Sequence, residues 1–111
     1  DIKTKMKNET KLRIKKINKE RDWEKFHTPS NLAKSIAIEA CELLECFQWD
    51  ESSFNLENVK DELADVLIYC EDLLNRLNLD DDTIVNQKLD KNEKKYPIDK
   101  CKGNAKKYTE L

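Results

Sequence analysis

The sequence predicts an all-α protein built from four helices, and three observations support this prediction. Charged residues make up 40% of the chain, and only one residue is glycine. Together with apolar residues at helical spacing, this composition is typical of helical proteins. Polar or proline-containing breaks at 28–31, 50–55, 78–80 and 97 divide the chain into four helical segments and a C-terminal tail. A chain of 111 residues fits one domain, so we expect residues 1–111 to form a single domain.

The first helix is predicted over residues 1 to about 25, with an incomplete apolar stripe among many lysines. The apolar positions of this stripe are Met6, Ile14 and Ile17. Its first few residues are expected to be flexible. Pro29 breaks the helical pattern, and Ser30 or Asn31 is expected to cap the helix that follows.

Two longer helices are predicted in the middle of the chain, from about Asn31 to Trp49 and from about Leu56 to Leu77. At about 100° per residue, each has a broad apolar arc. The arc of the second helix contains Leu32, Ala33, Ile36, Ala37, Ala40, Leu43, Leu44 and Phe47. The arc of the third contains Leu56, Val59, Leu63, Val66, Leu67, Cys70, Leu73, Leu74 and Leu77. Such arcs predict helices that pack against other helices.

Further apolar residues lie off these arcs, namely Ile38 and Cys41 on the second helix and Ala64 and Ile68 on the third. A four-helix monomer would leave them in water, whereas a second buried face accounts for them. We therefore expect a four-helix bundle that assembles as an obligate homo-oligomer.

The fourth helix is predicted from about Asp81 to Lys95. The acidic run 80–82 marks its beginning, and Pro97 ends it. Lys88 and Asn92 share one of its faces. The lysine-rich tail at 98–111 has no clear period and is expected to be flexible.

Two acid pairs carry the main functional signal, Glu39 with Glu42 and Glu62 with Asp65. Each pair has i, i+3 spacing, which places both carboxylates on one helix face. Each also borders the apolar arc of its helix, and this points to a seam between helices. Four carboxylates in one volume repel unless a hard divalent cation neutralises them, so we expect a Mg²⁺ site, with Mn²⁺ as an alternative ion. A solvated charged face is the competing interpretation.

Charge and cysteine usage exclude several classes of function. The formal net charge of -2 and the lack of a basic face argue against nucleic acid and membrane surfaces as partners. No apolar run approaches the ~20 residues that span a bilayer. The four cysteines include no CxxC pair, so we expect reduced thiols in a cytoplasmic protein. A single histidine, His27, argues against zinc and di-iron sites. The chain begins at Asp1 rather than Met, so the sequence leaves open whether an upstream segment has been removed.

The residues around the acid pairs resemble the MazG-like branch of the all-α nucleoside triphosphate pyrophosphohydrolase superfamily, and within it the dCTP pyrophosphatase subgroup. The mark of that family is ExxE followed by ExxD on the next helix, which correspond here to 39–42 and 62–65. The likeness covers about residues 20 to 111. The matching segments are RDWE-x-FH at 21–27, EL-x-E-x-FQW at 42–49, EL-x-DVLIY at 62–69, YP at 96–97 and G-x-A-x-KYT-x-L at 103–111.

This resemblance implies an enzyme that hydrolyses (deoxy)nucleoside triphosphates to monophosphate and pyrophosphate with Mg²⁺. It implies a role in nucleotide-pool sanitation or control, carried out by a homodimer or homotetramer. The implied metal ligands are Glu39, Glu42, Glu62 and Asp65, with Glu42 or Glu39 also catalytic. The implied substrate contacts are Trp23, His27, Trp49, Tyr69, Lys88, Asn92, Tyr96 and Lys107.

Alternatives to these roles remain open at the level of sequence. Both tryptophans could instead be core residues, and His27 could be a hydrogen-bonding loop residue. Ile14 stands nine residues before Trp23, where the subgroup has a histidine, so a preference for cytosine is left open. A non-catalytic helical interaction module would keep the bundle but would not respond to Mg²⁺ plus a nucleotide.

Overall fold

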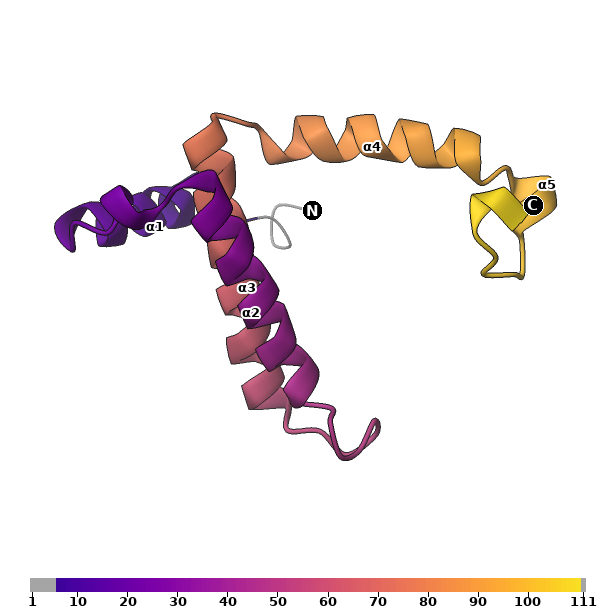
Figure 1. Cartoon of the computed structure of the whole chain (residues 1–111), viewed down its shortest axis with the longest axis horizontal. Helices are drawn as coiled ribbons and strands as arrows, with labels where there is room; N and C mark the ends of the chain where they lie inside the picture. The colour runs from indigo at the N-terminus through magenta and orange to yellow at the C-terminus, as the bar shows by residue number, and fades with distance from the viewer. Residues whose placement is uncertain (1–5, 111) are drawn as a thin grey trace. The chain divides into compact units, whose positions relative to one another are not determined.

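The computed structural model describes residues 6–110, and these residues form helices and turns without any strand (Figure 1). The all-α class is therefore confirmed. The helices are α1 (Asn8–Glu20), α2 (Pro29–Glu45), α3 (Leu56–Leu77), α4 (Asp81–Lys95) and α5 (Ile98–Cys101), with 3-10 turns η2 (Glu24–Phe26) and η3 (Tyr108–Glu110). Residues 1–5, which we assigned to the first helix, lie outside the described residues. Among the described helices, none combines the length and the apolar character needed to cross a bilayer.

The chain divides after Asn78 into two compact units. The first contains α1, α2 and α3, and the second contains α4 and α5. Both ends of α3 agree with the predicted boundaries, as do both ends of α4. The Asn55 side chain accepts a hydrogen bond from the Asn58 backbone N–H, and Asp80 does the same for Thr83, so each helix starts at a side-chain cap.

The first helix is shorter than predicted, because α1 ends at Glu20 rather than near residue 25. Asp22 adopts a left-handed conformation with φ of 54°, which turns the chain away from the helix axis. The backbone N–H of Trp23 then donates to the carbonyl of Asn18 at 2.9 Å. The η2 turn follows directly and leads to α2.

The cap of α2 also differs from the prediction. Thr28, not Ser30 or Asn31, occupies the capping position, and its hydroxyl oxygen accepts a hydrogen bond from the Asn31 backbone N–H at 3.1 Å. Pro29 then begins the helix, where its missing N–H costs nothing.

The predicted end of α2 at Trp49 was wrong, since the helix stops at Glu45. The Phe47 ring leaves the helical path to contact Phe54, with ring centroids 4.8 Å apart. The Asp50 carboxylate accepts hydrogen bonds from the backbone N–H groups of Ser52 and Ser53. These local contacts stabilise a turn, and they compete with continued helix.

Helices α2 and α3 lie side by side and form the main seam of the first unit (Figure 1). Along α2 and its C-cap, one row of covered or partly covered positions recurs at alternating steps of four and three, and it contains Leu32, Ile36, Glu39, Leu43 and Cys46. On α3 the corresponding row is Val59, Glu62, Val66, Tyr69 and Leu73. This is the spacing of a coiled-coil seam. Glu39 and Glu62 therefore occupy positions that usually hold apolar side chains.

Part of the predicted arc of α2 faces away from this seam, which corrects our assignment of its buried face. Ala33, Ala37 and Ala40 are exposed, and Leu44 is 69% exposed. Leu63 and Leu67 on α3 are also exposed, as are the four off-arc residues Ile38, Cys41, Ala64 and Ile68. The physical reason is that each apolar arc is broader than the row of residues that contacts the neighbouring helix. A broad apolar surface is left uncovered on the single chain.

Helix α1 packs across α3 through one buried apolar residue and two polar contacts. Ile14 is buried, and the Asn18 side-chain amide donates to Asp72 at 2.8 Å. The Lys11 ammonium lies 3.8 Å from the buried Glu71 carboxylate. All four cysteines are free thiols, and of these only Cys41 is exposed.

Candidate functional site

Three carboxylates from two helices converge in the α2–α3 seam. Glu39, Glu42 and Glu62 each offer an oxygen atom, and these atoms lie within 4.8 Å of one another. We call this group the acid cluster. It forms because Glu39 and Glu62 stand at seam positions of facing helices, while Glu42 lies one turn beyond Glu39. The predicted convergence of acids from both helices is thus found for three of the four.

The close approach of these carboxylates raises pKa values in the acid cluster and leaves buried oxygens without hydrogen-bond partners. A shared hydrogen bond with Glu42, followed by burial and the neighbouring carboxylates, raises the pKa of Glu39 to about 7. Burial, followed by contact with Glu42, raises the pKa of Glu62. Atom Oε2 of Glu39 and atom Oε2 of Glu62 are both buried without a hydrogen-bond partner. Buried anionic oxygens without donors fit a hard divalent cation, which takes oxygen ligands of this kind.

Asp65 lies outside this group and is exposed. Its charge nevertheless contributes to the raised pKa values of Glu39 and Glu62, so it stands near enough to add to the negative field. Tyr69 follows one turn later on α3. Burial raises the pKa of Tyr69, and the neighbouring carboxylates of Glu39 and Asp72 raise it further. The phenol therefore remains a proton donor beside the acids.

The two tryptophans are exposed at opposite ends of α2. Trp23 precedes η2 and is 46% exposed, and its ring contacts the Arg21 guanidinium at 5.8 Å. Trp49 follows α2 and is 90% exposed. The 17 residues of α2 separate them along an axis of about 25 Å, at 1.5 Å per residue. Neither indole is a core residue of this chain, and the two do not meet within it.

His27 does not join the acid cluster but lies beside the buried Asp72, which is 6% exposed. Burial raises the pKa of Asp72, while the Asn18 hydrogen bond and the charge of His27 oppose that shift. Sequence reasoning missed the Asn18–Asp72 pair. The available signal was positional, since Asp72 continues the row of Glu62, Asp65 and Tyr69 along α3.

The remaining predicted substrate residues belong to the second unit. Lys88 is exposed and Asn92 is partly covered on α4, and Tyr96 follows the end of that helix. The backbone N–H of Tyr96 donates to the Asn92 carbonyl at 2.9 Å. Lys107 is exposed immediately before η3. Lys88 and Asn92 share a face, as their i, i+4 spacing predicted.

Comparison with known proteins places this arrangement in a family. The sequence model of the MazG-like family matches residues 34–111, which include every member of the acid cluster. The chain belongs to the MazG-like family. This confirms the resemblance drawn from the ExxE and ExxD motifs.

Among MazG-like relatives, dCTP pyrophosphatase 1 of Rattus norvegicus is 39% identical over 101 residues, covering 83% of this chain and 59% of the relative. The Bos taurus protein of the same name is 41% identical, covering 83% of this chain and 60% of its own. The chain therefore spans less than two thirds of the length of these relatives. A crystal structure of a pyrophosphatase from Archaeoglobus fulgidus matches with a TM-score of 0.71 and 42% identity, covering 76% of this chain and 85% of that one.

Proposed function

We propose that this protein hydrolyses (deoxy)nucleoside triphosphates to monophosphate and pyrophosphate in a metal-dependent reaction. The observation that carries the proposal is the acid cluster, in which one oxygen from each of three carboxylates lies within 4.8 Å of the others and the Oε2 atoms of Glu39 and Glu62 are buried without donors. The names of the relatives, dCTP pyrophosphatase 1 and a pyrophosphatase, support the same bond cleavage.

Glu39, Glu42 and Glu62 would hold Mg²⁺, with Asp65 completing the set and Mn²⁺ as an alternative ion. When bound, the ion would neutralise these acids, attract the phosphates and lower the pKa of a water molecule. A triphosphate carries about four negative charges, so without a cation the cluster would repel it.

The chain's own residues would orient the reactants and accept a proton. Water oxygen would bond to the α-phosphorus while the bond from that phosphorus to the β-bridging oxygen breaks, releasing pyrophosphate. Glu42, or Glu39, would accept the proton of the water. Tyr69 would lie against the sugar, and the contacts to the phosphates would come from Lys88, Asn92, Tyr96 and Lys107. Lysine serves here as a point charge.

A base platform made from Trp23 and Trp49 requires two copies of the chain. A stacked base touches both rings, yet the two residues of one chain lie at opposite ends of α2, about 25 Å apart. We infer that Trp23 of one chain faces Trp49 of another, with His27 close to the same end as Trp23. Stacking of this kind contributes about 1–3 kcal/mol per base.

The uncovered apolar surface supports the same assembly. Leu44 on α2, together with Leu63 and Leu67 on α3, is exposed in the single chain. Large exposed apolar patches mark interfaces. Homodimerisation or homotetramerisation through this surface would complete the bundle and bring the two tryptophans together. Four free thiols fit a cytoplasmic setting, in which the enzyme would cleanse or control the nucleotide pool.

The test is a panel of common and modified dNTPs and NTPs with Mg²⁺, in which pyrophosphate and orthophosphate are scored separately. We expect pyrophosphate and a monophosphate in equal amounts. Glu39→Gln and Glu62→Gln should abolish turnover with helical content intact. Glu57→Gln is the matched control, because Glu57 lies on α3 with an exposed side chain paired to Lys60 at 3.2 Å, outside the cluster. Release of orthophosphate alone, or full turnover in both cluster variants, would refute the proposal.

A further inference from the structure

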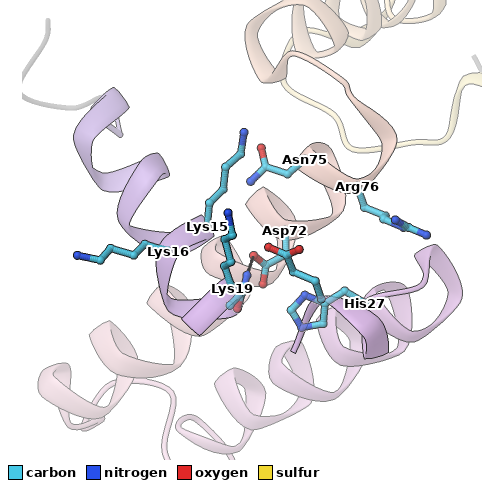
Figure 2. A pocket seen from close by; sticks show the side chains of 9 residues that line it. Lys15, Lys16, Lys19, His27, Asp72, Asn75 and Arg76 are labelled. Atoms are coloured by element: carbon cyan, nitrogen blue, oxygen red, sulfur yellow. Dashed lines mark hydrogen bonds between the residues drawn. The ribbon is translucent and has the colours of Figure 1, made fainter. Parts of the chain in front are cut away.

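A cavity of about 530 Å³ lies between α1, the η2 turn and the C-terminal end of α3 (Figure 2). Ligand pockets typically enclose ~300–1,000 Å³, so this one has the size of a small-molecule site. No member of the acid cluster lines it. Its first residue on α3, Asp72, is seven residues beyond Asp65, or about 10 Å along the helix. The cavity is therefore separate from the acid cluster.

Four cations border this cavity, Lys15, Lys16 and Lys19 from α1 and Arg76 from α3. None of the four has a carboxylate partner within the described residues. Two acids also line it, Glu24 and Asp72. The Asp72 carboxylate already accepts a hydrogen bond from the Asn18 side-chain amide at 2.8 Å. The balance of charge is positive, opposite to that of the acid cluster.

The lysines of α1 that border the cavity are exposed, and they differ in how they point relative to it. Figure 2 shows Lys15 and Lys19 extending from α1 in the same direction, toward Asn75, while Lys16 and Arg76 point away at the rim. Lys19 and Arg76 stand in the last turns of their helices, where a cation complements the helix dipole. The dipole does not account for Lys15, which lies one turn earlier.

We propose that this cavity binds a phosphorylated small molecule of nucleotide size without a metal ion. Lys15 and Lys19 hold the phosphate as paired point charges, and the Asn75 side-chain amide donates a further hydrogen bond. The Asn18–Asp72 pair forms the polar wall against which the remainder of the ligand lies. The site goes beyond the proposed hydrolysis, since an anion can occupy it while the acid cluster holds no cation.

Because the proposed site needs no metal ion, its binding can be measured in EDTA. In EDTA the acid cluster repels phosphates, so binding at that cluster is suppressed and the lysine variants described below test whether the remaining binding belongs to the cavity. Isothermal titration of the full chain in EDTA at low salt uses three probes: inorganic pyrophosphate, dCMP and dAMP. Pyrophosphate tests for the phosphate contacts, and the two monophosphates show whether the nucleoside adds affinity. We expect saturable binding with one ligand per chain for at least one probe.

Matched charge variants separate a site from general attraction. Lys15→Gln/Lys19→Gln should weaken binding at least about tenfold, the loss expected for one charge-assisted hydrogen bond. The double variant Arg13→Gln/Lys34→Gln removes two exposed cations of the same unit outside the cavity and should bind as wild type does. Circular dichroism verifies that both variants fold. No saturable binding by any probe, or an equal loss in both double variants, would overturn the proposal.

The Glu62→Gln variant keeps this inference independent of the proposed hydrolysis. Binding in EDTA should be unchanged in it, whether or not the wild type hydrolyses triphosphates. If EDTA binding changed in Glu62→Gln as much as it does in the lysine double variant, the probe would be sensing the acid cluster rather than the cavity, and the separate site would be refuted.

Discussion

Glu39 on α2 and Glu62 on α3 face each other across the seam with one buried, unpartnered carboxylate oxygen each. Both stand in rows of otherwise mostly apolar seam residues. A buried polar atom without a partner costs about 1–3 kcal/mol, more when charged. The protein therefore gives up stability at this point of the seam, as expected where side chains are retained for binding rather than for packing.

Neutralising one of these acids should stabilise the metal-free protein and abolish its response to Mg²⁺. Glu62→Gln removes a repelling charge and adds an amide that can donate to Glu42, so we expect the free energy of unfolding in EDTA to rise. Wild type should gain stability with Mg²⁺ by mass action, about 2.7 kcal/mol at a hundredfold excess over Kd. Thermal melts with and without Mg²⁺ measure both effects, with Glu57→Gln as control. A variant that still gains stability from Mg²⁺ would contradict the metal assignment.

The metal-free protein should become less stable as pH rises from about 5 to 8. The pKa of Glu39 is about 7 in the folded protein against 4.5 for the unperturbed group, so the folded state binds more protons across this window. Stability then falls with rising pH. Chemical denaturation at several pH values in EDTA gives the slope, and Glu39→Gln should flatten it. An equally steep slope in that variant would show that another group is responsible.

The buried contact between α1 and α3 should be sensitive to loss of its donor. Asn18→Ala leaves the Asp72 carboxyl group buried without the 2.8 Å hydrogen bond, at an expected cost of about 1–3 kcal/mol. Asn86→Ala is a suitable control, because the Asn86 amide donates to the Asp82 carbonyl at an exposed site. Urea denaturation compares the two. Equal, small losses in both variants would mean that α1 is held by Ile14 rather than by the polar pair.

A platform shared between two chains predicts complementation of inactive variants. Trp23→Ala and Trp49→Ala should each reduce turnover by at least about tenfold, the scale of one stacking contact. A mixed dimer contains one site with both substitutions and one with neither. After unfolding and refolding an equal mixture, half of the dimers are mixed, so about a quarter of wild-type activity should return in a twofold-symmetric assembly. No recovery above the level of the separate variants would argue against a shared platform.

The sequence predicted the helices of this protein well where a boundary has a local chemical cause. Asn55 and Asp80 cap α3 and α4 with their own side chains, so those starts agree with the prediction. The end of α2 was missed because Phe47 keeps the helical period of apolar residues while its ring packs on Phe54. That contact joins residues across a turn, and a period within one helix does not contain it.

The acid cluster could be predicted from the sequence, but other parts of the candidate site could not. The spacing of Glu39, Glu42 and Glu62 placed them at a seam, and the structure brings them together. Periodicity does not tell which sector of a broad apolar arc meets a helix of the same chain and which stays uncovered. The exposure of Leu44 follows from that ambiguity. The row of Glu62, Asp65 and Tyr69 pointed to the position of Asp72, but its partner Asn18 lies 54 residues away, so no local pattern identified the pair.

Cys41 is an exposed thiol on α2, three residues before Leu44 on the uncovered apolar surface. If that surface is closed by another copy, alkylation of this sulfur by a maleimide can proceed only while subunits are apart. The labelling rate of Cys41 should then slow as protein concentration rises, whereas a thiol on an open surface would react at a constant rate. The labelling rate of the Cys41 thiol would therefore measure how often the subunits separate, without an engineered label.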